Sequence, residues 1–321
     1  MKRLSLSIAI LGTACALAAC GSSGSSAKTS SPAPPSSTAP AGSGSSSALP
    51  TAAGSITVGS ADFPENEILA DIYADAMAAK GVKVTKKRNI GERPVYMAAM
   101  KDGSIGFIPE YTGSILVYLD PTATAKTPAE VFAALQAKAA PSLTALTYAP
   151  AQDSDTITVT KATADKYHLT SIADLAAVAN KLSFGAPAGF KTRADGIPAL
   201  QSVYGVTFKR FVPLTAGGIS TVTALKNGTI DGADIFSTDP SIAANGFVSL
   251  TDPKSMFAAQ NIVPLVDTAK LSQPMADASN AVSAKLDTAT LAGLVSKVAV
   301  GKQDPDAVAK AWLSSAVENT S

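Results

Sequence analysis

The chain has 321 residues, a formal net charge of +1 at pH 7, one His and two Cys. Because His168 is the single histidine and both cysteines lie within the first 20 residues, a histidine-rich metal site, a Cys nucleophile, a zinc ribbon and a disulfide framework are excluded for the rest of the chain. The near-neutral charge argues against a nucleic-acid partner. We expect neither a cofactor nor a metal.

Residues 1–19 have the features of a lipoprotein signal peptide. Lys2 and Arg3 form a basic start, and residues 4–19 carry no charge. This apolar run is shorter than the roughly 20 residues that a helix needs to span a bilayer, and it fits a secretory signal. It ends in Leu17-Ala18-Ala19-Cys20, which resembles the bacterial lipobox. The resemblance implies that Cys20 carries the lipid anchor; the alternative is an ordinary signal peptide that contains a cysteine.

A flexible tether is predicted after the signal peptide. Residues 21–54 include 12 Ser, 7 Ala, 5 Pro and 5 Gly among 34 residues. Such a composition buries too little apolar surface to offset the entropy of ordering the chain. As a flexible coil it would span roughly 30–35 Å. We therefore assign residues 20–54 to the lipidated cysteine and its tether, and we expect the folded part to begin at residue 55.

From Ile56 the chain alternates short apolar runs with helical patterns. The predicted elements, in chain order, are a strand over 56–58, a helix over 64–80, a strand from 82, a helix over 94–102 and a strand over 105–108. Gly81 and Gly103 mark the ends of the two helices, because glycine adopts the left-handed conformation at little cost.

The same order of elements returns about 125 residues later. Three segments match at offsets of 126, 124 and 125 residues: 182–185 with 56–59, 204–208 with 80–84, and 225–230 with 100–105. Three matches in the same order indicate two similar βαβαβ lobes. Alternation of strands and helices with short links favours mostly parallel sheets covered by helices.

Ligands of open parallel sheets bind beyond the carboxyl ends of the strands. The loops at these ends are 59–63, 109–114, 185–196 and 236–240. Under the third match, Tyr111 of the first lobe falls opposite Phe236 of the second. One aromatic ring from each side of a cleft is a way to hold a flat or cationic ligand. The alternative is that both rings belong to the core.

Several segments resemble the substrate-binding proteins of osmoprotectant ABC importers, which bind glycine betaine, carnitine or choline. They include Pro109-Glu110-Tyr111-Thr112-Gly113 and Phe236-Ser237-Thr238-Asp239, with further similarity in 59–69, 192–198, 257–266 and 304–313. The resemblance implies an α/β type II periplasmic-binding-protein fold of two lobes. These would comprise residues 55–156 plus 261–321, and 157–260, joined by two crossover hinge segments near 156–158 and 259–262.

The resemblance also implies a ligand site in which aromatic rings surround a quaternary ammonium group and polar groups hold a carboxylate. Two of the four cage positions are aromatic, as Tyr111 and Phe236, and the other two are Ile157 and Gln260. Ala61 replaces a lysine on the carboxylate side. The candidate ligand-binding residues are Ser60, Phe63, Tyr111, Thr112, Ser114, Asp155, Arg193, Phe236, Thr238 and Gln260. Two of these have structural alternatives: Arg193 as a brace for its loop, and Asp155 as a hydrogen-bonding residue of the crossover.

We therefore predict an extracytoplasmic solute-binding lipoprotein, anchored outside the cytoplasmic membrane in the cell envelope, that delivers a small polar or zwitterionic solute to an ABC permease. No nucleophile elbow, phosphate-binding loop or dinucleotide fingerprint indicates an enzyme. We expect a monomer. Each missing ring removes up to about 2 kcal/mol of cation stabilisation, so glycine betaine is expected to bind weakly, or a polyol or aromatic compound to replace it. A solute sensor that signals to a membrane receptor is the other alternative.

Overall fold

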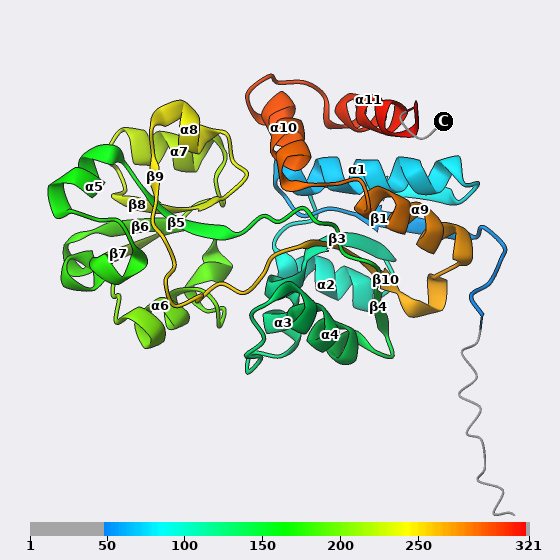
Figure 1. Cartoon of the computed structure of the whole chain (residues 1–321), viewed down its shortest axis with the longest axis horizontal. Helices are drawn as coiled ribbons and strands as arrows, with labels where there is room; N and C mark the ends of the chain where they lie inside the picture. The colour runs from blue at the N-terminus through cyan, green and yellow to red at the C-terminus, as the bar shows by residue number, and fades with distance from the viewer. Residues whose placement is uncertain (1–47, 319–321) are drawn as a thin grey trace, which may run out of the picture. The chain divides into compact units, whose positions relative to one another are not determined.

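Two five-stranded sheets organise residues 48–318, which are the residues that the computed structural model describes (Figure 1). The predicted signal peptide, Cys20 and most of the predicted tether lie outside these residues. Within residues 48–318, no helix has both the length and the apolar character needed to cross a membrane.

The first sheet has the strand order β2-β1-β3-β10-β4. Its strands are β1 (Ser55–Gly59), β2 (Lys83–Lys87), β3 (Phe107–Tyr111), β4 (Leu143–Ala145) and β10 (Ile262–Asp267). The helices around it are α1 (Pro64–Ala79), α2 (Arg93–Lys101), α3 (Thr112–Leu119), α4 (Pro128–Ala139), α9 (Gln273–Ser283), α10 (Thr288–Ala299) and α11 (Pro305–Glu318), with the short 3₁₀ helix η4 (Thr268–Lys270). We call this sheet and its helices the first lobe.

Alternating side chains of the first sheet bury two different cores, one on each face. Val58, Phe107 and Val266 pack into the core that includes α1, α9, α10 and α11. Ile108 and Val263 point the other way, into the core that includes α2, α3 and α4. The sheet is therefore covered on both faces, and its ligand-accessible region is confined to the strand ends.

The second sheet has the strand order β7-β6-β8-β5-β9. Its strands are β5 (Asp155–Val159), β6 (Ser183–Ala186), β7 (Arg210–Pro213), β8 (Gly232–Phe236) and β9 (Val248–Ser249). Its helices are α5 (Lys161–Tyr167), α6 (Ile197–Tyr204), α7 (Gly218–Lys226) and α8 (Ser241–Asn245), with the 3₁₀ helices η1 (Ile172–Ala177), η2 (Ala179–Lys181) and η3 (Ala188–Lys191). We call this sheet and its helices the second lobe.

The two sheets repeat one topology, which confirms the duplication predicted from the sequence. Strands β2, β1, β3, β10 and β4 correspond in order to β7, β6, β8, β5 and β9. Even the register is kept: Val58 pairs with Phe107 and Phe184 with Gly232, at offsets of 126 and 125 residues. The sheets are mixed, because β10 and β5 run antiparallel to both neighbours.

The segment Pro109-Glu110-Tyr111 was expected in a loop and instead lies in strand β3, with α3 starting directly at Thr112. A proline within a strand normally argues against the strand, because it has no N–H to donate. Here Pro109 lies opposite Pro264 of β10, so the two residues without a donor share one rung of the ladder. The consequence is that Tyr111 stands at the carboxyl end of β3.

The chain crosses between the lobes twice, through residues 146–154 and 250–261, and the two crossovers run side by side (Figure 1). Gln152 and Asn261 form an antiparallel bridge, and the Asp153 N–H donates to the Gln260 carbonyl at 3.0 Å. Strand β5 already begins at Asp155 and pairs with β8 along its length. The chain thus enters the second sheet slightly before the lobe boundary at 156/157 predicted from the sequence.

The last residues of the predicted tether are part of the folded unit. Leu49 and Ala53 pack against the core of the first lobe. The Gln273 N–H donates to the Pro50 carbonyl at 2.9 Å, and the Lys83 N–H donates to the Gly54 carbonyl at 3.0 Å. The predicted end of the tether at residue 54 is therefore wrong. Composition does not reveal such docking, because backbone carbonyls of any residue can accept these bonds.

Candidate ligand-binding site

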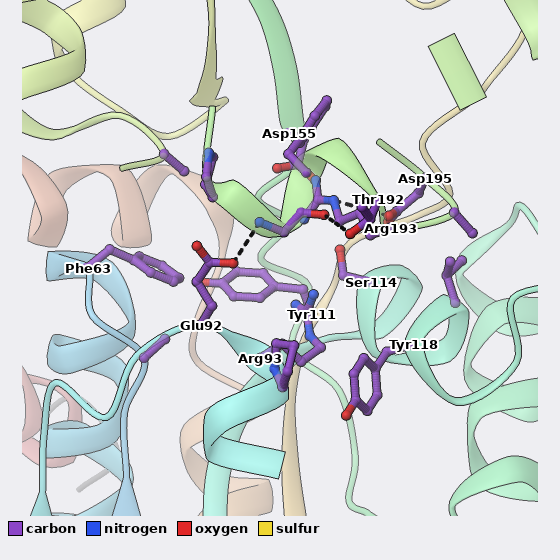
Figure 2. A pocket seen from close by; sticks show the side chains of 18 of the residues that line it. Phe63, Glu92, Arg93, Tyr111, Ser114, Tyr118, Asp155, Thr192, Arg193 and Asp195 are labelled. Atoms are coloured by element: carbon purple, nitrogen blue, oxygen red, sulfur yellow. Dashed lines mark hydrogen bonds and ion pairs between the residues drawn. The ribbon is translucent and has the colours of Figure 1, made fainter. Parts of the chain in front are cut away.

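A pocket of about 490 Å³ lies between the two lobes, and residues of both line it (Figure 2). Its volume is in the range of small-molecule sites. All four loops expected from the strand ends contribute: Phe63 follows β1, Tyr111 ends β3, Arg193 follows β6 and Phe236 ends β8. The pocket therefore sits where the carboxyl ends of both sheets face each other.

Three aromatic rings meet in this pocket, and we call them the aromatic trio: Phe63, Tyr111 and Phe236. The centroid of the Phe236 ring lies 5.0 Å from that of Phe63 and 6.3 Å from that of Tyr111. The rings of Tyr111 and Phe236 are nearly parallel, at 11°. An ammonium group midway between these two rings would lie about 3 Å from each ring centroid. This is closer than the roughly 3.5–4.0 Å at which two non-bonded carbon atoms make contact. Such a group can enter between these rings only if the lobes move apart.

The position of the Tyr111 ring is set by a buried carboxyl group of α1. The Tyr111 hydroxyl donates to Glu65 Oε1 at 2.8 Å. The other oxygen, Glu65 Oε2, accepts from the Thr238 hydroxyl of the second lobe at 2.5 Å. Glu65 thus joins the two lobes and fixes one member of the aromatic trio at the same time.

Asp153 of the first crossover completes this buried cluster. Its Oδ1 accepts from the Ser237 hydroxyl and from the Thr238 N–H, each at 3.0 Å. Burial raises the pKa of Asp153 well above its ordinary value, and the charge of Glu65 adds to the rise. Burial also raises the pKa of Glu65, although hydrogen bonds from Thr238, Tyr111 and Asp153 lower it. The pKa values of both acids are therefore raised, and that of Asp153 is raised further.

Both arginines of the pocket wall are engaged by carboxylates of the chain. Arg93 makes a two-pronged contact with Glu110, with distances of 2.9 Å and 3.1 Å. The Tyr96 hydroxyl donates to the same carboxylate at 2.7 Å. Glu110 belongs to the Glu-Tyr-Thr-Gly segment, and its role in the fold is to hold Arg93 next to the pocket.

Arg193 lies among three aspartates of the second lobe, of which Asp155 and Asp195 are labelled in Figure 2. Its Nη2 donates to Asp155 Oδ2 at 2.5 Å, and its Nε lies 3.1 Å from Asp195 Oδ1. The guanidinium carbon also lies 4.6 Å from the centroid of the Phe190 ring. The ion pair with Asp195 is the loop brace that was the structural alternative for Arg193.

Asp234 is the third aspartate, and it is fully buried. Neither of its carboxyl oxygens has a hydrogen-bond partner in the residues that the structure describes. Burial raises the pKa of Asp234 well above its ordinary value, and the charge of Asp155 raises it further. Burial therefore favours the protonated form of Asp234, while Asp155 and Asp195 contact Arg193 directly.

A second polar contact joins the lobes at the pocket wall. Glu92, directly before α2, accepts from the Gly189 N–H of η3 at 2.9 Å (Figure 2). A Cβ atom at position 189 would lie 2.6 Å from Glu92 Oε2, so glycine gives the carboxylate access to the backbone. Neither residue was a candidate from the sequence, because no local pattern shows that these two segments meet.

Six of the ten candidate residues line the pocket, and four do not. The lining residues are Phe63, Tyr111, Ser114, Asp155, Arg193 and Phe236. The side chains of Ser60, Thr112, Thr238 and Gln260 bond to the protein itself. Ser60 donates to the Ala61 carbonyl, Thr112 to the Ala259 carbonyl, and Gln260 to the Ser114 hydroxyl. These groups hold the loops and crossovers that carry the lining residues.

Ile157, at a position where the resemblance implies a cage aromatic, is fully buried in the core of the second lobe. Lining residues that the sequence did not single out include Glu92, Arg93, Asp153, Thr192 and Asp195. Thr192 and Asp195 lie within the segment 192–198 that carries part of the resemblance. Both residues also lie in the loop 185–196 that was expected at a strand end, so the sequence indicated their region without selecting them as ligand-binding residues.

Comparisons with a family model and with related proteins all lead to substrate-binding proteins of ABC transport systems. Residues 54–315 match the family model of the substrate binding domain of ABC-type glycine betaine transport system. The chain is 30% identical over 276 residues to the glycine betaine-binding protein YehZ of Escherichia coli (strain K12), covering 82% of this chain and 90% of that protein. It is also 30% identical over 222 residues to the carnitine transport binding protein OpuCC of Listeria monocytogenes, covering 66% and 71%.

Solved structures agree with the architecture described above. The structure of apo YehZ from Escherichia coli has a TM-score of 0.56 at 29% identity, covering 81% of this chain and 98% of that one. A crystal structure of a glycine betaine/carnitine/choline ABC transporter has a TM-score of 0.63 at 24% identity, with the same coverage. The second likeness concerns the fold alone. Together they confirm the predicted fold of two α/β lobes.

Proposed function

Because the chain belongs to the family of substrate-binding domains of ABC-type glycine betaine transport systems, we propose that its interlobe pocket captures a small solute with a quaternary ammonium head. The family has the type II periplasmic-binding-protein fold, and its members are extracytoplasmic substrate-binding transport proteins that work with an ABC permease and are not enzymes.

The aromatic trio is the observation that carries this proposal. A quaternary ammonium group has no N–H to donate, so only ring faces and carboxylates attract it. Phe63 and Tyr111 come from the first lobe and Phe236 from the second, so a cation held by all three would bridge the lobes. Since the ring centroids lie only 5.0–6.3 Å apart, solute entry requires opening about the two crossovers, and closure then follows binding.

A matched pair of ligands tests whether the rings recognise charge or only shape. Choline and 3,3-dimethyl-1-butanol have the same outline, and only choline carries the positive charge. We expect calorimetry to detect choline binding and to find the neutral analogue weaker. Equal affinities for the two compounds would contradict recognition of a cation by the rings.

Phe236→Leu tests the same proposal from the protein side. Loss of one cation–ring contact, worth about 0.5–2 kcal/mol, should weaken choline binding roughly two- to thirtyfold. Phe132→Leu is the matched control, because Phe132 packs against Tyr148 in the first lobe, with centroids 4.9 Å apart, and does not line the pocket. An equal change in both variants would indicate a general effect on the fold.

We also propose that Cys20 anchors the protein on the outer side of the cytoplasmic membrane, that residues 21–47 tether it, and that it delivers its solute to the permease as a monomer. The lipobox-like Leu17-Ala18-Ala19-Cys20 supports the anchor. Cys20→Ala should move the protein from the membrane fraction to the soluble fraction of the producing cells. Retention of the variant in the membrane fraction would contradict lipid anchoring.

A further inference from the structure

The pocket is larger than a choline-sized ligand needs. Its volume is about 490 Å³, whereas choline fills about 210 Å³ at about 30 Å³ for each non-hydrogen atom, the volume share of one water molecule. The ring centroids of the aromatic trio lie only 5.0–6.3 Å apart, so this volume is not the gap between the rings. It lies beside the trio, along the other residues that line the pocket.

Helix α3 forms one wall of this additional space. Ser114, Val117 and Tyr118 line the pocket, and their spacing of three and four residues places them on one side of the helix. Pro121, shortly after the helix, lines it too. Ser114 and Tyr118 are labelled in Figure 2. At a rise of about 1.5 Å per residue, this wall extends about 10 Å from Tyr111 to Tyr118.

The wall offers a ligand mainly apolar contacts. Ser114 is its polar member, and the hydroxyl of this residue already accepts from the Gln260 amide at 3.0 Å. Tyr118 is 43% exposed although it lines the pocket, so part of its ring is available to a ligand. Pro198 and Leu214 add apolar surface from the second lobe. Apolar ligand atoms placed here would leave no hydrogen bond of Ser114 unmade.

We infer that Ser114, Val117, Tyr118 and Pro121 form a second subsite, the α3 subsite, which takes an apolar, ring-bearing tail of a ligand whose ammonium head is held by the aromatic trio. This inference rests on the proposed function. It deepens that function by naming the class of ligand, which is a quaternary ammonium compound larger than choline. Arg193 and its loop lie outside the α3 subsite.

Two ligands with one head test the α3 subsite. Tetramethylammonium and benzyltrimethylammonium share the quaternary ammonium group, and only the second carries a ring. We expect calorimetry on the wild-type protein to find benzyltrimethylammonium binding about tenfold more tightly, as for partial burial of a phenyl ring.

Tyr118→Ser tests the place of the ring in the pocket. This substitution should lower the ratio of the two dissociation constants roughly two- to tenfold, because it removes an aromatic partner of the tail. Val300→Ser is the control. Val300, directly after α10, is an apolar residue that is 58% exposed and does not line this pocket, so the ratio should stay at its wild-type value.

The outcomes separate the α3 subsite from the proposed function. If the wild-type protein binds tetramethylammonium and gains nothing from the benzyl ring, the α3 subsite is wrong and the proposed function stands. The same conclusion follows if Tyr118→Ser, with unchanged circular dichroism and melting temperature, keeps the wild-type ratio. If Tyr118→Ser is unfolded, Val117→Thr, which keeps the shape of the side chain, replaces it. If neither compound binds to the wild-type protein, the proposed function fails and the α3 subsite with it.

Discussion

The hydrogen bond between Glu65 and Thr238 connects the lobes, and its removal should shift the protein towards an open form. Thr238→Val keeps the shape of the side chain and deletes the hydroxyl that donates to Glu65 Oε2 at 2.5 Å. Because the two residues belong to different lobes, this bond exists only when the lobes are together. The Thr238 N–H still donates to Asp153, so the loop after β8 keeps its own anchor.

The size of the effect follows from the bond that is lost. A side-chain hydrogen bond contributes about 0.5–3 kcal/mol, with the upper part of the range for a charged acceptor, which corresponds to a roughly two- to hundredfold smaller ratio of closed to open form. We expect this bond to re-form when the lobes close on the solute, so its loss should lower the apparent affinity by up to the same factor. This holds even though Thr238 does not line the pocket.

Two measurements on Thr238→Val check this reasoning. Calorimetry gives the affinity for choline, and small-angle scattering of the ligand-free protein reports the separation of the lobes. Thr221→Val is the matched control: Thr221 is also buried, and its hydroxyl donates to the Thr215 carbonyl within the second lobe. Unchanged affinity and unchanged scattering in Thr238→Val would refute the role of this bond. Weaker binding without opening would instead indicate that Thr238 contacts the solute.

Two further predictions concern a buried acid and a tight contact at the pocket wall. Since burial raises the folded-state pKa of Asp234 above the ordinary value of 3.8, its contribution to stability is complete below pH 3.8 and is lost as pH rises through the folded-state pKa. Urea unfolding of the wild-type protein should therefore show a loss of stability from about pH 4 to about pH 8, and this loss should be smaller in Asp234→Asn. Parallel stability profiles of the two proteins would argue against a role of Asp234 in this pH dependence. Gly189→Ala places a Cβ 2.6 Å from Glu92 Oε2 and should cost the bond to Glu92. At this half-buried position the lost hydrogen bond is worth about 1 kcal/mol, so choline should bind to Gly189→Ala roughly fivefold more weakly, while the melting temperature stays unchanged. Wild-type affinity in this variant would show that the bond between Gly189 and Glu92 does not support closure of the lobes.

The fold and the location of the pocket could be predicted from the sequence because both depend on local regularities. Glycine-terminated helices followed by apolar strands recur at one offset, and this repetition reports the duplicated topology. The rule that ligands bind beyond strand carboxyl ends then leads to Tyr111 and Phe236, which lie in the pocket. These features can be recognised in the sequence one segment at a time, without information on how the two lobes face each other.

The remaining parts of the site depend on contacts between distant segments. Glu65 and Thr238 are 173 residues apart in the chain, and Glu92 and Gly189 are 97 apart. No spacing rule brings such pairs together. Gln260 illustrates the opposite error: it occupies a cage position by resemblance, yet its amide bonds to the Ser114 backbone and hydroxyl. Once the aromatic ring is absent, the same position serves to hold the loop.

The most direct test of solute capture between the lobes is a crystal structure of the protein with choline. We predict that the trimethylammonium group lies in the interlobe pocket, within about 6 Å of the ring centroids of Tyr111 and Phe236, and that these rings have separated beyond their present 6.3 Å. Choline bound outside this pocket, or Tyr111 and Phe236 rings still 6.3 Å apart in the complex, would contradict the proposal that the aromatic trio holds the solute.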